Sequence, residues 1–563
     1  MEIHSSKISA QLVVAGLQKA GIENIVISPG SRNAPLIIEF TNQAFFNTYS
    51  VVDERVAGFF ALGMAQQKHQ PVVLVCTSGS ALLNYYPAIA EAFYSQIPLI
   101  VVSADRPQKW IDQGEGQSIR QHRVFANHSW FNTTLPEKED EQAVASLQNK
   151  IRQAIETSIE KQGPVHINVP FDEPLYEIVE RNKIDFPKVQ TEFSVRTYEE
   201  KFLENFASKW KDASKIMILA GQHQPSEFLQ KQLEKLSENK SVIVLNENIA
   251  NVHSDKFINN IDQAIFSLND NELRELQPEI LITTGRNLIS KKIKKFLRKY
   301  KPREHWHVEK TALPPDTFEA MTQHFDTSPE MFFSQFLFLI YDQMKTESGY
   351  QDKWLSLKKQ KKEKHRKFLS QTGFSDLKVF ELLSQQIPGD YMLQWGNSTT
   401  VRYAQLFDFQ KNNIHFSNRG TSGIDGSTST ASGAAYASER PVLAVTGDIS
   451  FLYDSNALWN KHIPKNFKII VINNGGGDIF NFIPGPAQTQ ALEDFFVTRH
   501  RLKAQKLAEM YGFGYQKIDN LEDLESFLPV FFSTNDRAHI LEIDTRKINN
   551  AEILKKYFEN LKD

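Results

Sequence analysis

The sequence predicts an α/β protein of three domains with parallel sheets, in which the first and third domains are copies of one fold. Short apolar runs alternate with helix-like segments throughout the chain, as in parallel α/β layers. Residue patterns near the N-terminus recur about 370 positions later. The length of 563 residues also suits about three domains. We place the predicted domains at 1–185, 186–365 and 366–563.

The first block contains predicted buried strands at 24–28, 72–75 and 99–103, each followed by a polar or glycine-containing turn. In open parallel sheets, ligands bind beyond the carboxyl ends of the strands. The turns at these ends contain small, polar or basic residues, among them Ser31, Arg32, Ser78, Gly79 and Arg106.

The last block repeats this pattern. Gly63 corresponds to Gly433 and Val72 to Val442, while the strand at 99–103 corresponds to 469–473. Single identities of this kind arise by chance. A register held over about 70 residues, with strands matching strands, is better explained by duplication of one fold than by a solenoid repeat.

Two strand ends in the last block bring together oxygen ligands. Asp448 follows a buried strand at 442–445, and Asn474 follows the next one at 469–472. A carboxylate, an amide oxygen and a glycine carbonyl such as that of Gly476 are hard ligands suited to Mg²⁺ shared with phosphate oxygens. The alternative is that each motif is ordinary loop punctuation, which is the better explanation for either one alone.

The middle block contains further predicted strands at 216–220, 242–245 and 280–283. It has no complete GxGxxG motif, so we expect a mainly structural domain. The basic run at 358–367 is predicted to be a solvated helix face, with a polyanion-binding patch as the alternative.

Composition excludes several classes of protein. The net charge of −3 and the pI of about 6.6 give no basic field for nucleic acid or an anionic membrane. Cys76 is the only cysteine, so no intrachain disulfide can form, and a reducing compartment is expected. The N-terminus lacks the apolar core of a signal peptide, and no run is long enough to span a membrane. We therefore expect a soluble cytoplasmic protein.

The 25 residues between Asp448 and Asn474 give a spacing that resembles the metal-binding motif of thiamine-diphosphate (ThDP) enzymes. Ile449 departs from the glycine that many of these enzymes carry. Glu54 follows a predicted strand in the first block, where this superfamily places the glutamate that activates the cofactor. A solvated charge or a helix cap is the usual role of such a residue taken alone.

Longer strings narrow the resemblance. Residues 28–35 (SPGSRNAP), 417–426 (SNRGTSGIDG) and 447–450 (GDIS) are similar to those of the MenD family, the 2-succinyl-5-enolpyruvyl-6-hydroxy-3-cyclohexene-1-carboxylate (SEPHCHC) synthases of menaquinone biosynthesis. The resemblance covers both outer domains well and the central domain weakly. It implies an N-terminal pyrimidine-binding domain, a central domain and a C-terminal diphosphate-binding domain.

The family resemblance implies a transferase that uses ThDP and Mg²⁺, with Mn²⁺ as a substitute. In this family, 2-oxoglutarate loses CO₂ and the succinyl carbanion equivalent adds 1,4 to isochorismate. Both substrates are dicarboxylates, for which arginine is the preferred partner. The resemblance also implies a homodimer as the minimal active unit, with a homotetramer usual among relatives.

The resemblance assigns roles to individual residues of this chain. The implied catalytic residues are Glu54, Gln117 and Arg32. The implied substrate-binding residues are Ser31, Arg32, Arg106, Gln117, Lys291, Ser398, Arg402 and Arg419, with Lys292 as an alternative to Lys291. The implied cofactor-binding residues are Glu54, Ser78, Gly79, Ile424, Gly447, Asp448, Ile449, Ser450, Asn474, Gly476, Ile479, Phe480 and Ile483. The implied metal ligands are Asp448, Asn474 and Gly476.

Two alternative functions remain open from the sequence. The chain could be another ThDP-dependent 2-oxo acid decarboxylase or carboligase, although the arginines favour dianionic substrates. It could also be a non-catalytic protein with the ThDP-binding fold. Retention of Glu54, Asp448 and Asn474 together weighs against that second alternative.

Overall fold

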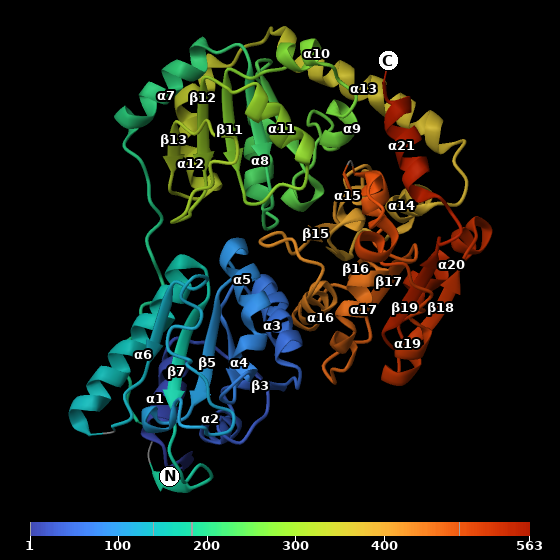
Figure 1. Ribbon diagram of the computed structural model, residues 1–563. Coiled ribbons are helices and arrows are strands. Elements are labelled where there is room, and N and C mark those ends of the chain that lie inside the picture. Colours follow the sequence, from blue (N-terminus) through green and yellow to red (C-terminus); the bar gives the residue numbers. More distant parts are fainter. Residues whose placement is uncertain (1, 139, 182–183, 484, 563) are drawn as a thin grey trace. The chain divides into compact units, whose positions relative to one another are not determined.

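The computed structural model describes residues 2–138, 140–181, 184–483 and 485–562 (Figure 1). The chain divides into two compact units, which are described separately. The first unit comprises Met1–Phe193, Asn418–Val442 and Ser450–Phe467. The second unit comprises Ser194–Ser417, Leu443–Ile449 and Lys468–Asp563.

The N-terminal sheet, blue to cyan in Figure 1, has six parallel strands in the order β3-β2-β4-β5-β7-β6. Its strands are β2 (Asn24–Ile27), β3 (Asn47–Ser50), β4 (Val72–Cys76), β5 (Leu99–Asp105), β6 (Phe131–Thr134) and β7 (Val165–Pro170). A separate antiparallel pair joins β1 (Glu2–Ser5) to β8 (Ile178–Arg181).

Helices cover both faces of this sheet because its strands are apolar on both sides. Val73 and Val75 face the cluster that includes α1 (Ile8–Lys19), α2 (Ala34–Thr41) and α6 (Glu141–Lys161). Val72 and Leu74 face the opposite cluster, formed with α3 (Glu54–Lys68), α4 (Ala81–Asn84) and α5 (Tyr86–Ser95). This alternation follows from the two-residue period of a strand.

The central sheet is parallel, with the order β10-β9-β11-β12-β13. Its strands are β9 (Ile216–Ala220), β10 (Val242–Asn246), β11 (Ile280–Thr284), β12 (Glu304–Val308) and β13 (Gln323–Phe325). One face packs on α7 (Glu200–Asp212), α8 (Glu227–Leu236) and α12 (Pro329–Ile340). The other packs on α9 (Ile261–Ile265), α11 (Lys291–Lys299) and α13 (Gly349–Leu369), near the short α10 (Asp270–Glu275).

The C-terminal sheet has the order β15-β14-β16-β17-β19-β18. Its strands are β14 (Met392–Trp395), β15 (Ile414–Phe416), β16 (Val442–Gly447), β17 (Phe467–Asn473), β18 (Gly514–Ile518) and β19 (His539–Asp544). A large core packs α14 (Asp376–Gln386), α15 (Thr399–Ala404), α20 (Leu521–Ser533) and α21 (Asn550–Asn560) against it. The remaining helices are α16 (Ser427–Ala437), α17 (Asp448–Tyr453), α18 (Ile479–Phe482) and α19 (Gln505–Tyr511).

The two outer sheets have the same topology. Subtracting twelve from each strand number of the C-terminal order gives the N-terminal order in full. The prediction of an α/β protein with three parallel-sheet domains and duplicated outer domains is therefore confirmed. The central strands β12 and β13 were not among the predicted strands.

The duplication is also visible where α3 packs against α16 inside the first unit. A Cβ added to Gly63 would lie 2.0 Å from the Thr430 carbonyl oxygen, and one added to Gly433 would lie 1.9 Å from that of Phe60. Each contact is the other shifted by the same 370 positions, as expected if α3 and α16 are corresponding helices of a duplicated fold. Only glycine permits such a close approach of helix backbones.

The basic run on α13 is only partly the solvated face that its charge predicts, because Lys359, Arg366 and Lys367 are exposed but other members are not. Lys361 is 1% exposed and donates to the carbonyl oxygen of Leu561 at 2.7 Å. Lys364 donates to the carbonyl oxygen of Lys562, and Lys358 to that of Phe257. Lys361 and Lys364 thus satisfy carbonyl groups that follow the end of α21, a favourable place for a cation. No helix in the described part of the chain combines the length and hydropathy needed to cross a membrane.

Candidate functional site

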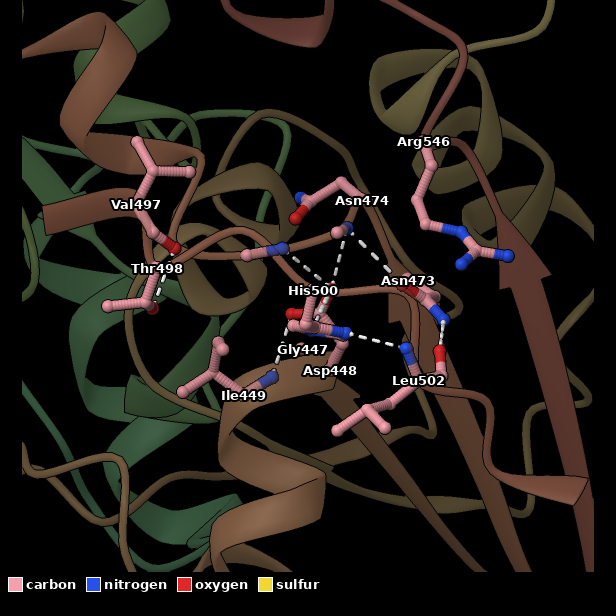
Figure 2. Close-up of polar contacts among 12 residues, drawn as sticks. Gly447, Asp448, Ile449, Asn473, Asn474, Val497, Thr498, His500, Leu502 and Arg546 are labelled. Carbon is pink, nitrogen blue, oxygen red and sulfur yellow. Dashed lines mark hydrogen bonds and ion pairs between the residues drawn. The ribbon is translucent and has the colours of Figure 1, made fainter. Parts of the chain in front are cut away.

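The Asp448 carboxylate connects the ends of β16 and β17. Its Oδ2 accepts hydrogen bonds from the backbone N–H groups of Gly475 at 2.7 Å and Gly476 at 3.0 Å (Figure 2). Its Oδ1 accepts one from the Ile449 N–H at 2.7 Å. Asp448 begins α17 and is 3% exposed. The predicted meeting of these strand ends is therefore present in the second unit.

The Asn474 side chain is held at only one of its two polar ends. Its Nδ2 donates to Asp376 Oδ2 at 3.0 Å, whereas its Oδ1 is buried and has no hydrogen-bond partner. A buried amide oxygen without a partner is costly unless a ligand satisfies it. Burial raises the pKa of the Asp376 carboxyl to about 7, against hydrogen bonds from Thr545 and Asn474 that lower it.

Gly476 adopts a backbone conformation with φ of 149°, and a Cβ there would lie 2.4 Å from the Val497 carbonyl oxygen. The loop therefore requires glycine at this position. His500 Nε2 lies 3.3 Å from Asp448 Oδ2, and His500 Nδ1 accepts the Leu502 N–H at 3.1 Å (Figure 2). Because Nδ1 is an acceptor, the ring proton of neutral His500 lies on Nε2, facing Asp448.

These donors fit a hard cation. A carboxylate and a free amide oxygen, with backbone carbonyls in the same turn, form an oxygen donor set that suits Mg²⁺. No group of three or more His, Cys, Asp or Glu side chains that could hold a metal ion occurs among the described residues, so this site differs from a His- or Cys-rich metal centre.

The remaining predicted cofactor residues of the second unit lie around this turn. Gly447 and Ile449 flank Asp448 at the end of β16. Phe480 packs against Phe496, with ring centroids 5.5 Å apart. Ile479 and Ile483, from α18 and its C-terminal end, line a cavity of about 440 Å³.

That cavity combines an apolar wall with cations. Lys291, Lys292 and Arg402 line it, and Arg402 Nε is buried without a hydrogen-bond partner. Lys292 Nζ lies 3.9 Å from the ring centroid of Phe266, a cation–π contact. Burial lowers the pKa of Lys292, while Asp262 raises it. An unpaired guanidinium nitrogen beside two amines favours an anionic ligand.

Ser398, just before α15, has φ of 71°, which is uncommon for a serine. A strained backbone of this kind is frequent at ligand sites. Ser398 thus follows β14 at the same edge of the C-terminal sheet as Asp448.

In the first unit, Glu54 is the first residue of α3. The Asp53 side chain caps this helix by accepting the N–H groups of Arg55 at 3.0 Å and Val56 at 3.2 Å. Glu54 is therefore not needed as the cap, which removes one structural explanation for it. Its Oε2 accepts a hydrogen bond from Asn84 Nδ2 at 3.2 Å.

A second turn of the first unit joins Ser78 and Gly79 to Gln117. Ser78 Oγ donates to the Gln117 carbonyl oxygen at 2.9 Å, and the Gly79 N–H donates to Gln121 Oε1 at 2.8 Å. Gln117 has φ of 54°, and a Cβ at Gly79 would lie 3.0 Å from it. Gln121, which also donates to Asn168 Oδ1 at 2.8 Å, supports this turn.

Arg32, which follows Ser31, and Arg106 form a local concentration of positive charge. Arg32 Nη1 donates to the Phe171 carbonyl oxygen at 3.0 Å, and Arg106 Nε donates to that of Gly116 at 2.9 Å. Burial and then the charge of Arg106 lower the pKa of Arg32. The nearby Glu173 lies 3.4 Å from Arg32 Nη1. Two guanidinium groups that influence each other in this way favour an anionic ligand.

The last predicted residues of the first unit are Arg419 and Ile424, between β15 and α16, and Ser450 in α17. Ser450 Oγ donates to the Ile424 carbonyl oxygen at 2.5 Å, and the Ile424 side chain is 37% exposed. Arg419 is buried at 8% exposure. The segment after it is held by Glu91, which accepts the N–H of Gly420 at 2.7 Å.

The structure thus groups the predicted residues within each unit. Glu54, Arg32 and Arg106 belong to the first unit, while Asp448 and Asn474 belong to the second. Sequence reasoning missed Asp376 and His500. Asp376 is a carboxylate at the start of a helix, and His500 is a histidine in a loop. The local sequence around them contains no pattern that identifies them as partners of distant residues.

Three family models match the chain in succession. Residues 9–124 match "Thiamine pyrophosphate enzyme, N-terminal TPP binding domain", 191–393 match "Middle domain of thiamine pyrophosphate", and 396–543 match "Thiamine pyrophosphate enzyme, C-terminal TPP binding domain". With the duplicated sheets and the Asp448–Asn474 turn, these matches define a thiamine pyrophosphate enzyme.

Similar proteins narrow the class. A 2-succinyl-5-enolpyruvyl-6-hydroxy-3-cyclohexene-1-carboxylate synthase of Flavobacterium psychrophilum is 50% identical over 98% of both chains. The synthase of the same name from Flavobacterium johnsoniae is 49% identical over 98% of both chains, and that of Phocaeicola vulgatus is 36% identical over the full length of both. The chain belongs to this synthase family.

Proposed function

We propose that this protein is a SEPHCHC synthase acting in menaquinone biosynthesis. It converts 2-oxoglutarate and isochorismate into SEPHCHC and CO₂ with ThDP and Mg²⁺. The observation that carries the proposal is the full-length similarity to synthases of this name, joined to an unsatisfied Asn474 oxygen near the buried Asp448.

The metal and the diphosphate belong at the C-terminal sheet edge. Asp448, Asn474 and the Gly476 carbonyl would hold Mg²⁺, and Mn²⁺ suits the same oxygens. Bound ThDP supplies a nucleophilic carbon and an electron sink. Further cofactor contacts would come from Ser78, Gly79, Ile424, Gly447, Ile449, Ser450, Ile479, Phe480 and Ile483.

Glu54 would hold a proton at the aminopyrimidine ring and exchange it during the reaction. Its carboxyl is the acid–base group that the first sheet places at the start of α3. In line with the family resemblance, we propose a homodimer as the active unit, within a homotetramer. A cytoplasmic location fits these small-molecule substrates.

Cations would bind the substrate carboxylates. Arg32, Arg106 and Arg419 would supply them from the first unit, and Arg402 with Lys291 or its neighbour Lys292 from the second. Ser31, Gln117 and Ser398 would add hydrogen bonds that orient the substrates. Two dicarboxylates together carry four negative charges, which supports a set of several fixed cations.

Product analysis tests the reaction. Purified protein with ThDP and Mg²⁺ should give SEPHCHC, identified by mass, when both substrates are present. Turnover of pyruvate alone would indicate another 2-oxo acid enzyme of the class. Absence of CO₂ release from 2-oxoglutarate, with isochorismate present, would indicate a non-catalytic protein.

The neighbouring lysines of α11 provide a matched pair of variants. Lys292 contacts Phe266, whereas Lys291 is exposed. We therefore expect Lys292→Ala to raise KM for a dicarboxylate substrate about tenfold, the scale of one hydrogen bond to a charged group. Lys291→Ala serves as the control and should change KM less than threefold in the same steady-state assay. The reverse result would assign the substrate contact to Lys291.

A further inference from the structure

The two ends of the Asn474 amide lie in different environments, although both are buried. The amino end donates to Asp376, while the carbonyl end has no protein partner. Rotating the amide by half a turn would place its oxygen against the Asp376 oxygen. Two facing acceptors repel each other, so Asp376 determines which end of Asn474 remains available.

Asp376 is itself fixed by residues from separate elements. It is 1% exposed and begins α14, after the capping residue Ser375. Its Oδ1 accepts the Thr545 hydroxyl at 2.6 Å, and its N–H donates to Asn550 Oδ1 at 2.8 Å. Asn550 Nδ2 also donates to Thr545 Oγ1 at 3.2 Å. The carboxyl group therefore cannot follow Asn474 if that side chain rotates.

We infer that Asp376 is a positioning residue for the metal site. It holds Asn474 Nδ2 so that Oδ1 faces the metal that the proposed function requires, and this inference rests on that proposal. Partners of metal ligands typically contribute 10–100-fold to metal affinity. Asp376 does not touch the cofactor in this proposal, because it acts through the amide.

Metal binding provides a measurement that does not depend on turnover. Mn²⁺ binding to the full-length protein with ThDP present can be followed by electron paramagnetic resonance of the free ion. Asp376→Leu keeps the branching at Cγ, although leucine is larger, and it removes the acceptor. We expect it to weaken Mn²⁺ binding about 10–100-fold.

Asp376→Asn is the conservative variant, because its amide oxygen can still accept the Asn474 Nδ2 hydrogen. We expect its Mn²⁺ affinity to remain within about threefold of the wild-type value. Recovery by the acceptor alone distinguishes positioning from a requirement for charge at this site.

Reversing donor and acceptor tests the pair directly. Asn474→Asp alone places two carboxyl groups face to face, and it should bind Mn²⁺ weakly. Adding Asp376→Asn supplies an N–H donor again, so the double variant should recover at least tenfold relative to Asn474→Asp. A double-mutant cycle without coupling would overturn the inference.

Glu39→Gln is the control for the loss of a buried carboxyl group. Glu39 is 1% exposed in the first unit and accepts the Ser5 N–H at 2.6 Å. This variant should lower the melting temperature without changing Mn²⁺ affinity. If the wild-type protein binds no Mn²⁺ with ThDP, the proposed function fails. If it binds and Asp376→Leu binds equally well, only the positioning role fails.

Discussion

The two outer sheets share one topology but carry different chemistry at the same edge. In the N-terminal sheet, β4 is followed by Ser78 and Gly79, and β5 ends at Asp105 before Arg106. In the C-terminal sheet, β16 is followed by Asp448 and β17 by Asn474. The residue after β5 is thus a cation, Arg106, whereas the residue after β17 is an amide, Asn474.

This difference shows that the buried strands and the strand-end residues are set independently. The strands are apolar in both copies, because each sheet is covered on both faces. The residues just past their ends do not support the core and can diverge. Duplicated folds can therefore divide one reaction between them, with acid–base groups on one copy and metal ligands on the other.

The largest expected effect is that of replacing Glu54, the proposed acid–base residue of the N-terminal domain. Glu54→Gln should lower turnover roughly 10²–10⁴-fold, the usual range for an acid–base group, because glutamine cannot exchange a proton. ThDP and Mn²⁺ affinity should stay near the wild-type values, since the proposed metal ligands belong to the other copy. Steady-state rates and calorimetric titration with ThDP check the two parts. Near-wild-type turnover would remove Glu54 from the mechanism.

A second test concerns Asp105, the last residue of β5. The last residue of β17 is Asn473, which cannot titrate. Burial raises the pKa of Asp105 from 3.8 to about 6, although a hydrogen bond from Asn168 lowers it. A carboxyl whose pKa is raised on folding binds protons more tightly in the folded state, so stability falls as pH rises from about 4 to 6. The fall is about 3 kcal/mol for two pKa units.

Asp105→Asn should remove this fall, because an amide does not titrate, just as Asn473 does not at the end of β17. The melting temperature of the variant should therefore rise relative to the wild-type protein as pH increases from 4 to 6, and the difference should level off above that range. Parallel profiles for the two proteins would show that Asp105 does not titrate in this range.

The smallest effect concerns the symmetry of the α3–α16 contact. Gly63→Ala and Gly433→Ala each add only a Cβ, which would meet a carbonyl oxygen at 2.0 or 1.9 Å. Overpacking of this kind costs about 1–3 kcal/mol, and the two losses should be similar. Melting temperatures compare them, with Gly373→Ala, which has open space around it, as the control. A large inequality would mean that the two contacts are not equivalent.

Much of the fold and the meeting of two strand ends at the proposed metal site could be predicted from the sequence. Strands and their ends follow from local apolar periods, and parallel strands end at one edge, so Asp448 and Asn474 were expected to meet. The contacts of the basic run on α13 could not be predicted in this way. Its lysines contact carbonyl oxygens about 200 residues away, and charge pattern contains no information about such partners.

The sequence by itself determined the duplicated α/β architecture and the kinds of group at the strand ends, because both depend on short-range patterns. Only the tertiary structure decided that Asp376 holds Asn474, that His500 faces Asp448, and that Lys292 lies on Phe266. The Asp376–Asn474 contact joins residues 98 positions apart. Contacts of that kind exist only after separate elements have packed together, so no local pattern can specify them.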